Sequence, residues 1–188
     1  MSATPIEISV GGSRWASSWA QDLMTWEDFT ESLSARMYNN ASTETHAEYM
    51  ALSKAEQDKR KDVGGFVGGS LRDGLRRRGC CTGRSLITLD MDAAPPAAHS
   101  SGWPPSRPWA QQRSIPPGST TRSTHAAGHL PHRRVMQPEE YQPCARMVAQ
   151  MLDPTMQVFD KTTFEAERLM YWPSRSSDSQ WVCEHRGR

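Results

Sequence analysis

The sequence lacks the features that mark several common classes of protein. Its four cysteines form no C-x-x-C pair, so a zinc ribbon is not indicated. No stretch approaches the ~18 apolar residues of a membrane-spanning helix, and the N-terminus has no signal-peptide pattern. The glycine-rich residues 63–70 do not contain the G-x-x-x-x-G-K-[ST] pattern of a P-loop. These absences predict a cytoplasmic protein with reduced thiols and no membrane association.

Charge of neither sign is in excess. The chain has 22 Lys and Arg against 21 Asp and Glu, a formal net charge of +1. Any attraction for nucleic acid must therefore come from a local patch rather than from the whole molecule. The 188 residues suffice for one domain that needs neither a disulfide nor a metal to hold its core.

Acidic residues are missing altogether from residues 93–134. This segment holds eight of the thirteen prolines and four of the six histidines, and its composition predicts an irregular, disordered linker. A structureless loop of this length is unusual inside a compact domain. The segment separates an N-terminal half, residues 1–92, from a C-terminal half, residues 135–188, of one domain.

Outside that segment, hydrophobic periodicity and capping residues predict a mixture of helices and strands. Trp26, Phe29, Leu33 and Met37, for example, share one helical face that begins after Thr25. The glycines of residues 63–70 favour a strand or hairpin whose backbone approaches another segment closely. The expected elements are strands at 5–10, 85–92 and 158–160, and helices at 26–37, 55–61 and from about 139 to 152.

The run RSLITLDMD, residues 84–92, ends in two carboxylates that point to one face of the expected strand, Asp90 and Asp92. Two carboxylates about 4 Å apart repel by roughly 4 kcal/mol at an effective dielectric near 20. Such a pair is either exposed to solvent or bound to a hard cation such as Mg²⁺. For a D-x-D pattern alone, solvent exposure is the commoner case. Asp160 ends a second apolar run, VFD, and would complete a metal site, or it would cap the following turn.

Basic residues near these carboxylates have two interpretations each. His125, in RSTH, would contact a nucleotide phosphate or be a solvated histidine in a polar stretch. The arginine cluster before the strand would bind nucleic-acid phosphates or form a solvated turn. The candidate nucleotide- and nucleic-acid-binding arginines are Arg76, Arg77, Arg78, Arg84 and Arg168.

Taken in order, several segments resemble primase-like proteins of phages and mobile elements. The segments are KDVGGFVGGSLRDGLRRRG, RSLITLDMD, STH, PEEYQPCARMVAQML and FDKTTFEAERLMYWPS. Such proteins belong to the archaeo-eukaryotic primase-polymerase superfamily and accompany virulence-associated E helicases. The resemblance covers residues 1–92 and about 135–185.

The resemblance implies an α/β (α+β) fold, with an RRM-like antiparallel sheet and flanking helices. It also implies that Asp90, Asp92 and Asp160 hold Mg²⁺ or Mn²⁺ and that His125, in the s-x-H pattern, contacts the incoming nucleotide. The implied activity is nucleotidyl transfer on a single-stranded DNA template, with nucleotides as substrates and a replicative helicase as a partner.

The segment 93–134 departs from the family's pattern, which has helix and strand sequence at this place. We hypothesise that it is frameshifted and that this copy is inactive; translation of all three frames of the gene tests this. Two alternatives to a primase-polymerase stay open. One is a non-catalytic nucleic-acid-binding replisome adaptor, and the other is a metal-dependent nuclease, to which three aspartates are equally suited.

Overall fold

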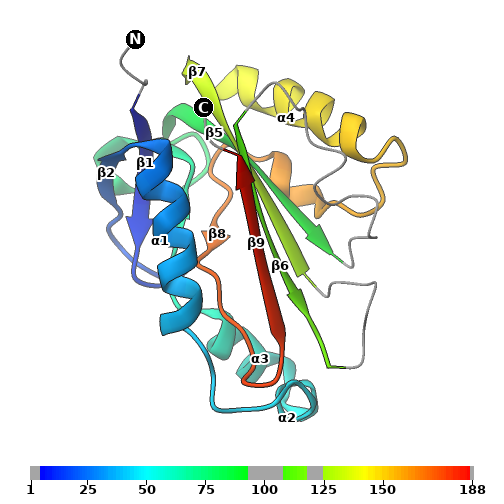
Figure 1. Ribbon diagram of the computed structural model, residues 1–188. Helices are drawn as coiled ribbons and strands as arrows, with labels where there is room; N and C mark the ends of the chain where they lie inside the picture. Colours follow the sequence, from blue (N-terminus) through cyan, green and yellow to red (C-terminus); the bar gives the residue numbers. More distant parts are fainter. Residues whose placement is uncertain (1–4, 93–107, 118–124, 187–188) are drawn as a thin grey trace.

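The computed structural model describes residues 5–92, 108–117 and 125–186, which form helices and two antiparallel sheets (Figure 1). The smaller sheet has the order β2-β1-β3-β8 and the larger one β4-β5-β7-β6-β9. The predicted α+β fold class is confirmed. The smaller sheet comprises β1 (Ile6–Gly11), β2 (Ala20–Met24), β3 (Gly65–Val67) and β8 (Met170–Tyr171). The larger comprises β4 (Gly69–Leu71), β5 (Cys81–Asp92), β6 (Trp109–Ile115), β7 (His125–Met136) and β9 (Gln180–Arg186).

The helices begin at residues whose side chains cap them. In α1, the Thr25 hydroxyl accepts the Asp28 backbone N–H, and the Asp28 carboxylate accepts the Thr25 N–H in return. Ser53 and Glu56 form the same reciprocal pair at α3, so both predicted helices are confirmed. The α-helices are α1 (Trp26–Asn39), α2 (His46–Ala51), α3 (Lys54–Lys61) and α4 (Pro138–Leu152), and the short 3-10 helices include η1 (Arg72–Gly74) and η4 (Lys161–Phe164).

The glycine-rich residues 63–70 form β3 and β4, one in each sheet, and they do approach other backbone closely. A Cβ atom at Gly65 would collide with the Met170 carbonyl oxygen, and one at Gly69 would collide with that of Gly83. Only glycine fits such contacts, as the sequence predicted. Between the two strands, the Gly68 carbonyl accepts the backbone N–H of both Ser85 and Leu86. The chain thereby ties the two sheets together next to β5.

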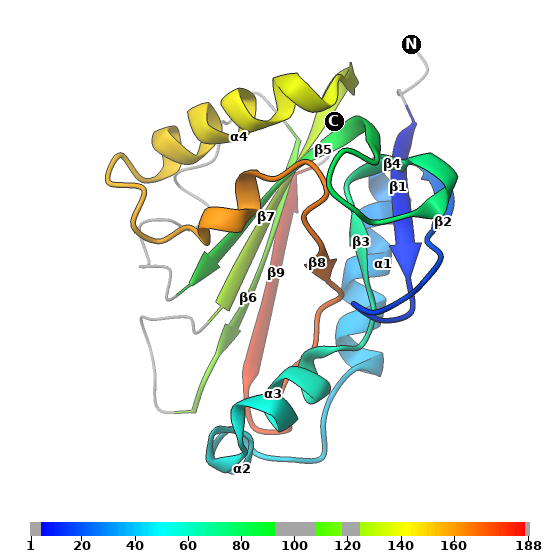
Figure 2. The same ribbon diagram turned by 180° about the vertical axis from the view of Figure 1, so that it is seen from behind.

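The larger sheet has a separate layer of core on each face. Ile87, Leu89 and Met91 of β5 pack toward α4, whereas Leu86 packs with α1 and the smaller sheet. Figures 1 and 2 show α4 on one side of this sheet and α1 on the other. Asp90 and Asp92 are four and six residues after Leu86 in the strand. Their side chains therefore point to the same face of the sheet as that of Leu86, the face covered by α1.

Residues 93–134, which their composition predicts to be one irregular segment, contribute two strands instead. Residues 109–115 and 125–134 lie in β6 and β7, two inner strands of the larger sheet. Their side chains are small or polar, with Ala110, Ala126, Ala127 and Gln112 among the buried ones. Backbone pairing on both edges and burial between two helical layers outweigh the weak strand preference of this composition. The frameshift itself stays a hypothesis.

Candidate functional site

Asp90 and Asp160 are 70 residues apart in the chain but adjacent in the structure. The segment before η4 runs antiparallel to the end of β5, with Met91 and Phe159 as bridge partners. The Asp160 N–H donates to the Asp90 carbonyl at 3.0 Å, and the Asp92 N–H donates to the Val158 carbonyl at 2.8 Å. The expected strand at 158–160 is therefore reduced to one bridge, which nevertheless sets Asp160 beside Asp90.

One guanidinium nitrogen lies between these two carboxylates. Nη2 of Arg168 donates to Asp90 Oδ2 at 2.7 Å and to Asp160 Oδ2 at 2.6 Å. Burial lowers the pKa of Arg168, but the hydrogen bond and charge of Asp90, with the charge of Asp160, outweigh it and raise the pKa overall. The other oxygen of Asp160, Oδ1, accepts the Thr162 N–H at 2.8 Å and caps η4. Asp160 thus caps the turn and also belongs to the acidic pair.

A buried hydrogen-bond network holds this acidic pair in place. Thr163 Oγ1 accepts the Asp90 N–H at 2.8 Å and donates to the Thr88 carbonyl at 3.2 Å. The Tyr141 hydroxyl of α4 lies 3.0 Å from the carbonyl oxygens of both Thr88 and Thr163. The network ties β5, η4 and α4 together immediately behind the carboxylates.

Asp92 and His125 are partners in the β5–β7 register, so the third aspartate and the candidate histidine start from neighbouring backbone positions. Asp92 is exposed, whereas Asp90 is buried. The structure describes the backbone of His125 only, and Ser123, the first residue of the predicted s-x-H pattern, falls outside the described residues. No group of three or more His, Cys, Asp or Glu that could hold a metal ion occurs within the described ranges.

Arg84, one of the predicted phosphate-binding arginines, is fully buried. Its guanidinium donates to Thr88 Oγ1 at 2.9 Å and to the Ala166 carbonyl at 3.1 Å, and it lies over the Tyr141 ring at 4.0 Å. A phosphate cannot reach it in this structure. We therefore assign Arg84 to the support of the acidic pair and not to a binding surface.

The other predicted arginines lie in the loop after η1. Arg77 and Arg78 are exposed, whereas Arg76 is partly buried and donates to the Arg14 carbonyl at 3.0 Å. The loop is held by Glu167, whose carboxylate accepts the Gly79 N–H at 2.8 Å. Since Glu167 is next to Arg168 in the chain, this basic loop is attached to the segment whose Arg168 side chain contacts the acidic pair.

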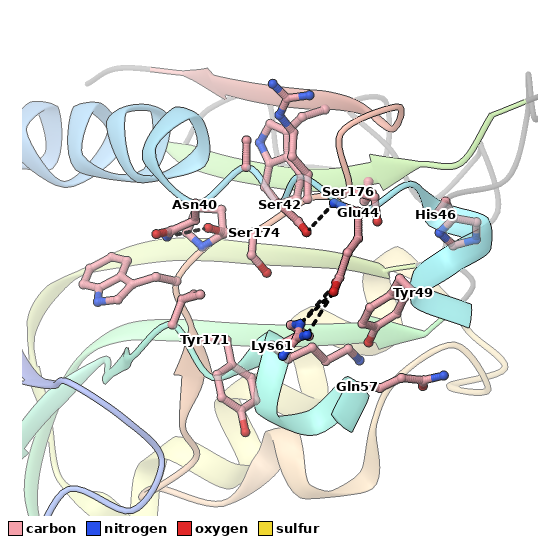
Figure 3. A pocket seen from close by; sticks show the side chains of 18 of the residues that line it. Asn40, Ser42, Glu44, His46, Tyr49, Gln57, Lys61, Tyr171, Ser174 and Ser176 are labelled. Carbon is pink, nitrogen blue, oxygen red and sulfur yellow. Dashed lines mark hydrogen bonds and ion pairs between the residues drawn. The ribbon is translucent and has the colours of Figure 1, made fainter. Parts of the chain in front are cut away.

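A cavity of about 650 Å³ lies on the α1 side of the larger sheet (Figure 3). Among the described residues, Asp90, Asp160 and Arg168 are not part of its lining, and the acidic pair is related to it through the neighbouring strand β7. The floor of the cavity includes Ala127, the register partner of Asp90, and Gln112, the partner of Ala127. Residues directly opposite each other in antiparallel strands share a face, so these three positions form one row across the sheet. Ser114 and Trp181 extend the next row, which starts at Asp92 and His125.

The cavity wall is basic and aromatic. Arg60 and Lys61 of α3 line it together with Arg175, against a single carboxylate among the described lining residues, Glu44. Glu44 reaches across to Arg60 and accepts two hydrogen bonds from Nε and one from Nη2, as the dashed lines in Figure 3 mark. The aromatic lining residues are Tyr49, Tyr171, Trp172 and Trp181.

The acidic pair matches the requirements of a divalent cation in part. Asp90 and Asp160 supply the hard carboxylate oxygens that Mg²⁺ and Mn²⁺ prefer, and both oxygens already point at one atom. These two oxygens now contact Arg168 Nη2, so they would hold a cation only in place of that guanidinium. The residues therefore fit a cation provided that Arg168 withdraws.

Sequence patterns do not identify several residues of this site. Periodicity assigns Tyr141 only to the apolar face of a helix, and no pattern marks Thr163 or Glu167. Gln112 and Ser114 lie in residues 93–134, whose composition does not predict strands. The cavity wall brings together residues from distant parts of the chain, which hydrophobic periodicity does not detect.

The comparisons with known proteins show one family. The VapE N-terminal domain family matches residues 2–187, almost the whole chain, including residues 93–134. No curated protein and no solved structure matches the chain. Among the described residues, no helix is both long and apolar enough to cross a membrane.

A match of this extent shows the family directly and agrees with the resemblance to proteins that accompany virulence-associated E helicases. It associates the chain with replication in phages and mobile elements. The chain belongs to the VapE N-terminal domain family.

Proposed function

We propose that this domain is a metal-dependent nucleotidyltransferase of the primase-polymerase type, acting on a single-stranded DNA template. The observation that supports this best is the convergence of Asp90 and Asp160 on one point, together with a basic, aromatic cavity that includes Ala127, the register partner of Asp90 on the next strand. Cavities of about 300–1,000 Å³ are usual for small-molecule and cofactor sites, so the volume suits a nucleotide. The larger sheet, covered by helices on both faces, would then play the part of the RRM-like sheet.

Each group of residues has a role in this proposal. Asp90, Asp160 and the exposed Asp92 would hold Mg²⁺ or Mn²⁺, which would neutralise charge on the phosphates of the nucleotide. The cationic wall of the cavity would attract the same phosphates, and the aromatic side chains would contact the base. His125 would approach the nucleotide from the strand position next to Asp92.

The exposed Arg77 and Arg78 would bind the backbone of the template strand outside the cavity. Their loop is fixed to Glu167, so a strand bound there would pass close to the acidic pair. A replicative helicase would supply the unwound strand, in keeping with the family's association with virulence-associated E proteins.

The direct test is primer synthesis and primer extension on single-stranded DNA with Mg²⁺ or Mn²⁺. If the wild type incorporates nucleotides, the Asp90→Asn/Asp92→Asn double variant should lose at least about a hundredfold in rate, because both substitutions remove metal-ligand charge. A wild type that incorporates none is the result that the hypothesis of an inactive copy predicts. Asp22→Asn, on the exposed edge strand β2, is the matched control and should retain wild-type activity.

The alternatives predict different results in the same experiment. Degradation of the template without incorporation, abolished by the double variant, would indicate the nuclease. Salt-sensitive DNA binding that is unchanged in the double variant, with no metal-dependent chemistry, would indicate the replisome adaptor. Incorporation that survives the double substitution would contradict the proposed site.

A further inference from the structure

We propose that Arg168 is a built-in competitor of the divalent cation: its guanidinium neutralises Asp90 and Asp160 until metal and phosphate arrive together. The inference rests on the metal site of the proposed function and adds its regulation. It assigns Arg168 a positioning role that neither the family match nor the nucleotide-binding prediction contains.

The geometry makes the guanidinium and a bridging cation mutually exclusive. Nη2 of Arg168 is within 2.7 Å of one carboxylate and 2.6 Å of the other, and a cation shared by both oxygens would fall at nearly the same point. The pair is largely shielded from water, with side-chain exposures of 24% for Arg168, 12% for Asp90 and 29% for Asp160. Shielding strengthens these attractions relative to those of an exposed ion pair, so the cation must displace a firmly held group.

Arg168 is close in the chain to the basic cavity, although it is not itself among the described lining residues. It is two residues before β8, whose Tyr171 lines the cavity, and its neighbour Glu167 holds the arginine loop. The exchange proposed here requires the displaced guanidinium to turn toward that cavity. A phosphate group in the cavity would offer Arg168 a bidentate acceptor in exchange for the two carboxylates. Phosphate binding would then release the carboxylates for the cation, and cation binding would release Arg168 for phosphate.

Such an exchange couples the two ligands thermodynamically. Each ligand raises the affinity for the other by the same factor, because each one removes the contact that excludes its counterpart. In the absence of nucleotide, the site stays neutralised and holds metal weakly. The coupling would prevent the site from retaining a cation, and from hydrolysing nucleic acid, when no nucleotide is present.

The test is Mn²⁺ binding to the full chain, followed by electron paramagnetic resonance and by titration calorimetry without nucleotide. We expect Arg168→Gln to bind Mn²⁺ about tenfold or more tightly than the wild type, a typical size for coupling between sites. Arg168→Lys should fall between the two, since an ammonium cannot reproduce the fixed geometry of the guanidinium. Lys59→Gln, which removes one exposed positive charge from α3, controls for net charge and should bind like the wild type.

Thermal unfolding keeps the test independent of activity. Without metal, Arg168→Gln should unfold at a lower temperature than the wild type because its two carboxylates repel, and Mn²⁺ should raise its unfolding temperature more than that of the wild type. Equal Mn²⁺ affinity in the wild type and Arg168→Gln, or no Mn²⁺ binding by either, would overturn the inference. Tighter binding in Arg168→Gln by a protein that extends no primer would support the inference while contradicting the proposed polymerase function.

Discussion

Two arginines near the acidic pair make different kinds of contact. Arg84 lies behind it, fully buried, with its donors directed to a carbonyl, a hydroxyl and a ring face. Arg168 lies in front of it, partly exposed, with its charge directed to two carboxylates. The partners of Arg84 are neutral and fixed by the core, whereas those of Arg168 are ionic, which is why the proposed exchange concerns Arg168. The surroundings of each arginine, and not its residue type, distinguish these two cases.

His129 is an ionisable side chain inside the core between β7 and α1. Its ring contacts Phe29 and Phe66, with ring centroids 5.5 and 5.6 Å away, and only 1% of the residue is exposed. Gln112 Nε2 lies 3.2 Å from His129 Nε2, so the ring nitrogen accepts a hydrogen bond in its neutral form. Burial lowers the pKa of His129 to about 3, and the charge of Arg84 contributes in the same direction.

This depressed pKa predicts that the protein loses stability in mild acid. The unfolded chain binds a proton at His129 near pH 6.5 and the folded chain only near pH 3, so the free energy of unfolding falls as the pH drops below 6.5. Between pH 7 and pH 5 the expected loss is about 2 kcal/mol. Urea unfolding at both pH values measures it.

The substitution His129→Gln supplies the control for that prediction. It keeps a polar partner for Gln112 but cannot titrate, so its stability should change much less between pH 7 and pH 5. The carboxylates with lowered pKa values, such as Glu140 at about 2, contribute only at pH values below this window. If the wild type and His129→Gln lose the same free energy of unfolding between pH 7 and pH 5, a group other than His129 causes the loss.

At the scale of elements, α4 is the support of the candidate site. It packs on β5 with the apolar face that includes Tyr141, Ala145 and Val148, and the Tyr141 hydroxyl reaches the backbone of both β5 and η4. The helix therefore fixes the relative position of the strand that carries Asp90 and the turn that carries Asp160.

We predict that Tyr141→Phe, which removes only this hydroxyl, destabilises the protein by about 1–2 kcal/mol in urea unfolding at neutral pH. The buried carbonyls of Thr88 and Thr163 would each lose a partner at a place that water does not reach. Tyr38→Phe, at a position that is 69% exposed, is the control and should change stability by less than about 0.5 kcal/mol. A difference no larger than that of the control would show that α4 holds the site by apolar packing alone.

The strands β6 and β7 are unusual as inner strands. Alanine, glutamine and histidine occupy positions where inner strands usually carry large aliphatic residues, and Gln111, Gln112 and His129 are all buried. The sheet nevertheless uses their backbone fully, with continuous pairing from Trp109 to Ile115 on β9 and from Ala110 to Ser114 on β7. This composition is what the frameshift hypothesis predicts, and the reading frames of the gene remain its test.

The wall formed by α2 and α3 is attached to the rest of the molecule by polar contacts. Neither helix has a buried residue. The Asp58–Arg14 ion pair attaches α3 to the segment after β1, whereas Glu44 with Arg60 joins the start of α2 to α3. Such contacts contribute little stability individually and weaken with salt. This wall is therefore the part of the cavity that can move most easily when a ligand binds.

At the scale of the whole molecule, a nearly neutral chain has two local groups of positive charge near the acidic pair. One lines the cavity, with Arg60, Lys61 and Arg175, and the other is the arginine loop. The loop is joined to the acidic pair through the adjacent residues Glu167 and Arg168. Local arrangement, which net charge does not reveal, produces these two groups.

This arrangement predicts the salt dependence of DNA binding. If Arg77 and Arg78 each contact one phosphate, the slope of log K against log salt for single-stranded DNA should lose about 1.4 in magnitude in the Arg77→Gln/Arg78→Gln variant. Arg146→Gln, on α4 across the sheet from the cavity, is the matched control and should leave the slope unchanged. Fluorescence anisotropy of a labelled oligonucleotide over a salt series measures both. If the salt dependence of the double variant equals that of the wild type, the arginine loop does not contact the DNA.

Features that depend on neighbouring residues follow from the amino-acid order alone. Thr25 with Asp28 and Ser53 with Glu56 define helix starts through contacts three residues apart, and Gly65 and Gly69 require close backbone approach wherever they lie. Alternation along β5 likewise placed Asp90 and Asp92 on one face.

What those carboxylates face depends on the folded chain. The position of Asp160 beside Asp90, the guanidinium of Arg168 between them and the burial of Arg84 all arise from contacts between residues far apart in the chain. The strands β6 and β7 arise from pairing with β5 and β9, which supplies the backbone hydrogen bonds that their own composition does not favour. Sequence patterns reflect the preferences of residues close together in the chain. The contacts between distant residues stabilise the protein only once the sheet has formed, so these patterns do not predict them.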